Sequence, residues 1–107
     1  MPQHSTKSMV LTEPGNIEQR EFEIPDIDDN EGLLQVEMTS ICGSDISMYK
    51  GDPVSRENCP LLLGHEVVGR IHTAGEQFCE NHSVKEGDRV VVEPYIPCYN
   101  CENCQTG

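Results

Sequence analysis

The sequence is poor in aromatic and basic residues. Its 107 residues include no Trp, three Tyr and two Phe, so a hydrophobic core must be built from Val, Ile, Leu and Met. Lys and Arg total 7 against 19 Asp and Glu, which gives a net charge of −12. That charge argues against nucleic acid or an anionic membrane as a partner. The length predicts one domain with a modest core.

Long apolar runs and a secretion signal are also missing. No apolar stretch approaches the roughly 20 residues that a membrane-spanning helix needs, and residues 1–7 carry no hydrophobic signal region. The six cysteines do not suggest a disulfide scaffold, because Cys42, Cys59 and Cys79 are scattered and the other three are close together. We therefore expect a cytoplasmic, reduced protein that uses cysteines as metal ligands.

The hydrophobic pattern is typical of a β protein. Short apolar or alternating segments are separated by Pro, Gly and acidic turns, which predicts a small barrel or sandwich. Ser44 and Asp45 are expected to cap a short helical turn, and the acidic residues 26–32 form a solvated loop. The predicted strands are 8–11, 17–24, 33–39 and 89–93, with a further apolar run over 61–71.

Three cysteines close to the end of the sequence form a metal-binding pattern. Cys98, Cys101 and Cys104 supply three thiolates within seven residues through two C-x2-C steps. Zinc is the favoured metal, and an iron–sulfur cluster is the alternative, because bacterial ferredoxins begin with the same spacing. A four-thiolate site needs one more cysteine, so we expect the sequence to be a fragment of a larger metalloprotein.

A second possible metal site joins Cys42 to His65 and Glu66. Zinc accepts thiolate, imidazole and carboxylate ligands together, but only tertiary folding can unite residues this far apart. His65 and Glu66 would point to opposite faces of a regular strand, so both reach one metal only if the backbone bends at Gly64. A buried cysteine and a hydrogen-bonded structural histidine are the alternative explanations.

Five motifs follow one another along the chain: Ile41–Asp45, Tyr49–Gly51, Leu63–Glu66 with Gly69, Gly87–Val90, and the three cysteines Cys98, Cys101 and Cys104. The sequence resembles the N-terminal part of the zinc-containing medium-chain dehydrogenases, which act on alcohols, polyols, sugar acids and threonine. The resemblance implies a GroES-like, partly open β-barrel with short helices and a cysteine-rich zinc lobe, followed in the family by a nicotinamide-binding Rossmann domain. It assigns residues 1–107 to the catalytic domain, incomplete at its C-terminus.

The resemblance also implies roles for single residues. Cys42 and His65 match ligands of the catalytic zinc, and Glu66 matches a carboxylate that binds this zinc or lies just behind it. Asp45 matches a carboxylate that orients the imidazole, and Ser44 matches the hydroxyl that passes on the substrate proton. The lobe cysteines match three of the four ligands of a structural zinc.

The implied activity is oxidation of an alcohol, polyol or sugar acid by NAD or NADP, in a protein that is a homo-oligomer at full length. The 107 residues alone are expected to be inactive, because they contain no glycine-rich dinucleotide fingerprint. Ser47 departs from the family where many members carry a relay histidine, and Tyr99 replaces the usual glycine. The alternative is a stand-alone zinc-binding module without redox activity.

Overall fold

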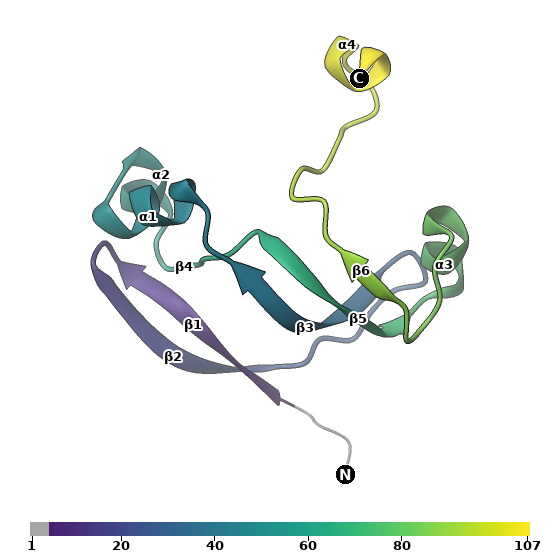
Figure 1. The fold of residues 1–107 in the computed structure, drawn as a ribbon, viewed down its shortest axis with the longest axis horizontal. Helices are drawn as coiled ribbons and strands as arrows, with labels where there is room; N and C mark the ends of the chain where they lie inside the picture. The colour runs from purple at the N-terminus through teal and green to yellow at the C-terminus, as the bar shows by residue number, and fades with distance from the viewer. Residues whose placement is uncertain (1–4) are drawn as a thin grey trace.

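The strands form two antiparallel sheets of three strands each. A computed structural model of the protein describes residues 5–107. Residues 1–4, which belong to the segment 1–7 predicted to carry no secretion signal, lie outside the described residues. The strand order is β2-β1-β4 in one sheet and β3-β5-β6 in the other. The strands are β1 (Ser5–Glu13), β2 (Asn16–Glu23), β3 (Gly32–Ser40), β4 (Leu61–Leu62), β5 (Glu66–Ala74) and β6 (Arg89–Val91) (Figure 1).

The predicted mainly β fold with short helices is confirmed. Each predicted strand overlaps an observed one, and the apolar run over 61–71 contains β4 and most of β5, divided at Gly64. Among the described residues the two sheets do not join into one closed barrel. Within this part of the chain no helix is long and apolar enough to cross a membrane.

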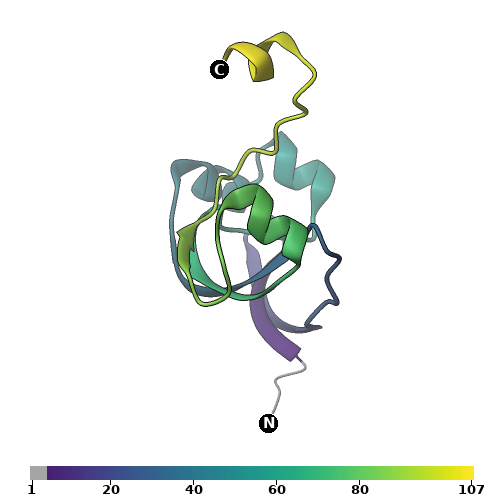
Figure 2. The same ribbon diagram turned by 90° about the vertical axis from the view of Figure 1, so that its right-hand side faces the viewer.

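The described residues include four short helices, which connect strands or follow the last one, and the sequence predicts only the first. α2 begins at a proline behind the capping carboxylate of Asp52, which accepts the Ser55 N–H at 2.9 Å. α3 covers one end of the second sheet, and α4 lies away from both sheets in two perpendicular views (Figure 2). The helices are α1 (Gly43–Lys50), α2 (Pro53–Asn58), α3 (Glu76–His82) and α4 (Glu102–Thr106).

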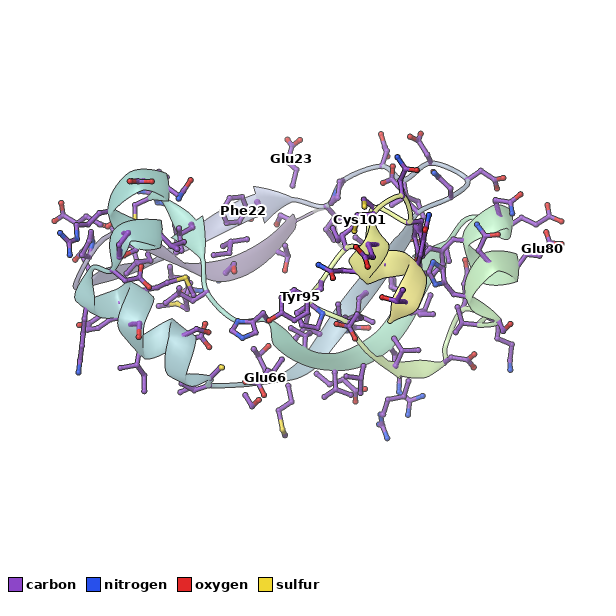
Figure 3. The ribbon with its side chains drawn as sticks, turned by 90° about the horizontal axis from the view of Figure 1, so that it is seen from above. Phe22, Glu23, Glu66, Glu80, Tyr95 and Cys101 are labelled. Atoms are coloured by element: carbon purple, nitrogen blue, oxygen red, sulfur yellow. The ribbon has the colours of Figure 1, made fainter. Side chains whose placement is uncertain are left out.

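The buried apolar core is small. Among the described residues, the apolar side chains in the buried class are Val10, Leu11 and Ile71. Acidic side chains such as Glu23 and Glu80 extend outward from the ribbon (Figure 3). Many large apolar side chains are exposed, including Met38 and Val91 on the second sheet.

The acidic loop before β3 is exposed, as predicted, but it also anchors α3. The Asp29 carboxylate accepts the Glu76 N–H at 3.0 Å, and the Asp29 carbonyl accepts the Phe78 N–H at 3.0 Å. Gly75 lies so close that a Cβ atom there would come within 2.0 Å of the Asp29 carbonyl oxygen. The loop therefore supplies the side-chain cap that α3 lacks at its own N-terminus.

The pairing of β3 with β5 brings the candidate ligands together. The two strands are antiparallel, and the last pair at one end of their ladder is Ser40 with Glu66. Cys42 follows the end of β3 by two residues, and His65 immediately precedes β5. Residues separated by more than 20 positions in the sequence therefore meet at the same end of the sheet.

Candidate metal centres

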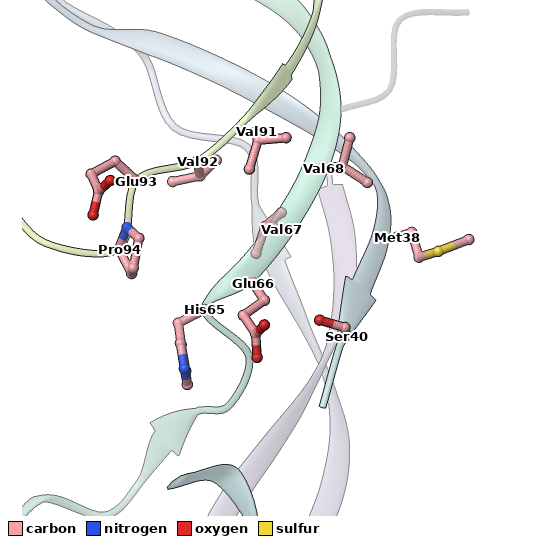
Figure 4. Close-up of a pocket in the computed structure, with 10 residues that line it drawn as sticks. All are labelled: Met38, Ser40, His65, Glu66, Val67, Val68, Val91, Val92, Glu93 and Pro94. Atoms are coloured by element: carbon pink, nitrogen blue, oxygen red, sulfur yellow. The ribbon is translucent and has the colours of Figure 1, made fainter. Parts of the chain in front are cut away.

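The backbone bends between β4 and β5, immediately before His65. Gly64 has a φ of 99°, a conformation that other residues rarely adopt, and a Cβ atom there would lie 2.7 Å from Cγ2 of Thr39. His65 thus lies outside the regular strand that Glu66 begins, so the alternation of a strand does not separate the two side chains. Figure 4 shows both side chains extending in the same direction from this bend.

The side chains of Cys42, His65 and Glu66 converge. Each contributes one ligand atom, and these atoms all lie within 4.8 Å of one another. Cys42 and His65 are half-buried and Glu66 is exposed. Zinc accepts a thiolate, an imidazole and a carboxylate as ligands, so these three side chains have the ligand types and the spacing to hold one metal ion.

Ser44 and His65 hold the Cys42 thiol in an environment that favours the thiolate. The hydroxyl and the backbone N–H of Ser44, followed by the imidazole of His65, lower the pKa of Cys42, although Glu66 opposes this effect. Cys42 and not Ser44 is the N-cap of α1, and the Asp45 carboxylate completes a capping box by accepting the Cys42 N–H at 3.0 Å, so the prediction that Ser44 and Asp45 cap this helix is correct for Asp45 alone. A thiol at a helix N-terminus has this shift because the first N–H groups favour negative charge.

The imidazole of His65 lies between a thiol and two carboxyl groups. The hydrogen bond with Cys42, followed by the charge of Asp45, raises the pKa of His65, although partial desolvation opposes the rise. Nε2 lies 3.4 Å from Oγ of Ser44, and Nδ1 lies 3.6 Å from Oδ1 of Asp45. The Nε2 atom therefore faces the Ser44 side of the site, while Nδ1 faces the buried carboxyl group.

A cavity opens beside His65 and Glu66. Its volume is about 600 Å³, within the usual range for a small-molecule site. Ser40 and Glu93 also contribute polar side chains to its lining, and the rest of the wall is apolar (Figure 4). The sequence does not predict the apolar lining of this cavity, because valines in strands usually belong to the hydrophobic core. The apolar lining residues are Met38, Val67, Val68, Val91, Val92 and Pro94.

The three lobe cysteines form a second cluster. The Sγ atom of Cys104 lies 3.6 Å from that of Cys98 and 3.4 Å from that of Cys101. The backbone N–H of Asn100, then the thiols of Cys101 and Cys104, lower the pKa of Cys98 to about 7. All six cysteines are free of disulfides, so the three sulfur atoms are available to a soft metal ion.

The departures from the family pattern have distinct local structures. Tyr99 adopts a φ of 60°, a left-handed conformation that glycine adopts more easily than tyrosine. The Ser47 hydroxyl donates to the Gly43 carbonyl at 3.3 Å. The remaining cysteines, Cys59 and Cys79, belong to neither cluster.

The mainly β fold and the two clusters are typical of the GroES-like domain of zinc-type dehydrogenases. A family model, the alcohol dehydrogenase GroES-like domain, matches residues 28–107. The chain belongs to this family of zinc-type medium-chain alcohol and polyol dehydrogenases.

Similar proteins agree with this assignment over most of the chain. An uncharacterized zinc-type alcohol dehydrogenase-like protein of Haemophilus influenzae is 41% identical over 102 residues, which are 94% of this chain and 29% of that protein. Sorbitol dehydrogenase of Bombyx mori is 32% identical over 92% of this chain and 28% of its own. An Escherichia coli alcohol dehydrogenase solved with NADH has a TM-score of 0.79 and 33% identity, over 97% of this chain and 29% of that one. This chain thus spans less than a third of these relatives.

Proposed function

We propose that the chain is the catalytic-domain portion of an enzyme that oxidises an alcohol, polyol or sugar acid with NAD or NADP. The observation that carries the proposal is the convergence of Cys42, His65 and Glu66 within 4.8 Å in a chain of this family. The sorbitol specificity of one relative and the NADH complex of another support the substrate class and the cofactor. The alternative is a stand-alone zinc-binding module without redox activity, which a negative result in the activity assay below would favour.

The residues present fit zinc at both clusters. Cys42 and His65 would hold the catalytic ion, with Glu66 binding it or lying just behind it, and three thiolates would hold a structural ion in the lobe. A zinc ion held at the first cluster would supply Lewis-acid polarisation of the substrate hydroxyl, and a bound nicotinamide cofactor would supply the hydride acceptor. The lobe ion would replace an apolar core as the source of local order.

The protein side chains would perform the proton chemistry. Ser44 is exposed, and its hydroxyl lies 3.4 Å from Nε2 of His65, beside the cavity that would admit substrate. It would therefore relay the proton that leaves the substrate hydroxyl, accepting it while the exposed hydroxyl gives up its own proton to solvent. The apolar wall of the cavity would exclude water around the carbon that loses the hydride. Because the Ser47 hydroxyl is bonded to a helix carbonyl, we propose that the onward proton path does not use it.

Zinc analysis of single variants tests the two metal sites. In reduced protein we expect zinc at both clusters, with occupancy below one in the isolated chain because the lobe lacks a fourth thiolate. Cys42→Ala should remove zinc from the first cluster and leave the lobe occupied, and Cys98→Ala should do the reverse, since the clusters share no ligand. Elemental analysis with circular dichroism provides the measurement. Loss of both ions from a folded Cys42→Ala variant would refute independent sites.

An activity assay tests the proton role of Ser44. The assay requires the longer protein that includes the region following this segment in the relatives, because the 107 residues hold no dinucleotide fingerprint. Alcohols, polyols and sugar acids are offered with NAD+ or NADP+, and formation of the reduced cofactor is followed. Ser44→Ala should lower kcat by about 10²- to 10⁴-fold with unchanged zinc content. A longer protein that binds zinc but oxidises none of these substrates would contradict the proposed function.

A further inference from the structure

Asp45 is an acidic side chain in an unusual place. It is only 6% exposed, and among the described residues no other Asp or Glu belongs to the buried class. A buried carboxylate is costly unless its oxygen atoms are paired or hydrogen-bonded. The partners of Asp45 therefore indicate why the protein keeps a charge at this point.

Two backbone N–H groups are the hydrogen-bond donors to this carboxylate. The Cys42 N–H donates to Oδ2 at 3.0 Å, and the Gly64 N–H donates to Oδ1 at 3.2 Å. By contrast, Nδ1 of His65 lies 3.6 Å from Oδ1, which is longer than a good hydrogen bond. By distance, the two backbone hydrogen bonds to Asp45 are stronger than its contact with the His65 imidazole. The imidazole is the partner that the family resemblance implies for this carboxylate.

The two donors belong to the two segments that carry the candidate ligands. Cys42 is itself a candidate ligand after β3, and Gly64 immediately precedes His65. The β3–β5 ladder ends at the pair Ser40 with Glu66, so both donors lie beyond the last strand pair. Asp45 connects the two segments where the sheet no longer does, through one hydrogen bond on each oxygen.

We propose that Asp45 is a positioning residue that joins the Cys42 and Gly64 backbones and so sets the distance between the thiol and the imidazole before metal binds. The proposal rests on the proposed function, since it concerns the same site. Only a carboxylate can perform this role fully, because both of its oxygens accept. An Asn side chain would turn its NH2 group toward one of the two backbone N–H donors, whichever way its amide is oriented.

Asp45→Asn tests the proposal, with Asp52→Asn as the matched control. Asp52 is another helix-capping carboxylate, and its Oδ1 accepts the Ser55 N–H at 2.9 Å. Asn caps a helix about as well as Asp, so the control removes the same charge and keeps its contact. We expect amide hydrogen exchange at Cys42 and Gly64 in metal-free protein to accelerate in Asp45→Asn and to stay unchanged in Asp52→Asn.

Metal binding supplies the second measurement. The ring resonances of His65 report zinc binding at this site, separately from the lobe. Asp45→Asn should weaken this binding about 10- to 100-fold, with lobe affinity unchanged. Unchanged exchange and affinity in Asp45→Asn would overturn the proposal.

Hydrogen exchange of the wild-type protein tests the proposal without requiring that any variant folds. The amides of Cys42 and Gly64 should already be protected from exchange before zinc is added. If they become protected only after zinc is added, the metal and not Asp45 assembles the site, and the proposal fails. If His65 resonances never respond to zinc in the wild type, the proposed function fails at this site, while the exchange data still decide the role of Asp45.

Discussion

At the scale of single residues, the Cys98 sulfur is the clearest case of a neighbourhood that changes reactivity. The backbone N–H of Asn100 donates to it at 3.4 Å, and two further thiols lie beside it. These contacts favour the thiolate and lower the pKa of Cys98 to about 7. Because the thiolate is the nucleophile and the metal ligand, an exposed Cys98 is suited to bind a metal ion at neutral pH.

Alkylation of metal-free, reduced protein tests this property. The rate of Cys98 modification by iodoacetamide should rise with pH to a plateau, with its midpoint near the pKa of about 7. Peptide mass spectrometry across a pH series gives the midpoint, and added zinc should protect the thiol as a control. A midpoint at or above the ordinary cysteine value of about 8.5 would show that the three donors have no such effect.

Residue identity predicts the members of the two clusters but not all of their contacts. The C-x2-C spacing predicts that the sulfur atoms of Cys98, Cys101 and Cys104 lie close together, because the three residues fall within a segment of seven. The meeting of Cys42 and His65 depends on tertiary folding, so the sequence predicts it only through the family resemblance. The hydrogen bonds that Asp45 accepts from two backbone N–H groups leave no pattern in the sequence, because every residue except proline can supply such a donor.

At the scale of elements, a three-strand ion cluster spans the second sheet. Glu37 on β3 accepts two hydrogen bonds from Arg89 on β6, at 3.0 and 3.1 Å, and lies 3.8 Å from Nε of Arg70 on β5. The bidentate contact with Arg89 is the largest cause of a lowered pKa of Glu37. One acidic side chain therefore links all three strands of the sheet.

The pH dependence of stability should reveal this cluster. Glu37 has a lower pKa in the folded chain than in the unfolded one, so its contribution is present above the unfolded pKa and disappears as pH falls through the folded value. Arg89→Gln should therefore reduce the free energy of unfolding at neutral pH and have little effect in strong acid. Urea unfolding across a pH series measures this. An equal loss at every pH would mean that Arg89 acts through packing instead of charge.

The contact between the acidic loop and α3 gives a steric prediction. Gly75→Ala would place Cβ 2.0 Å from the Asp29 carbonyl oxygen, which neither backbone can accommodate without moving. Overpacking of this kind costs about 1–3 kcal/mol in the free energy of unfolding. Gly43→Ala is the control, because a Cβ atom there meets nothing within 4 Å. Urea unfolding of both variants should show a loss for the first alone.

Short helices were harder to predict than strands for physical reasons. α3 has no side-chain cap within its own sequence, because the cap comes from Asp29 more than 40 residues earlier. α4 follows Cys101, a residue that rarely caps a helix. Strands were predictable because alternation and Pro–Gly turns are local signals.

At the scale of the whole molecule, stability depends on very few buried apolar side chains. Leu11 is fully buried and Met9, two residues earlier on β1, is 54% exposed. Leu11→Ala should cost about 2–5 kcal/mol, which is comparable to the entire stability of a small domain. We expect that variant to be largely unfolded by far-ultraviolet circular dichroism, and Met9→Ala to remain folded. A cooperative, wild-type-like unfolding curve for Leu11→Ala would contradict this account of the core.

The flat outline of the protein has a practical consequence for measurements of its size. The chain measures 47 by 40 by 21 Å with a radius of gyration of 15.9 Å, whereas a compact chain of this length would have about 13 Å. Such a plate experiences more friction than a sphere of equal mass. A monomer would therefore elute early from a gel-filtration column, at the volume expected for a dimer. Its assembly state should be determined by light scattering, which measures molar mass.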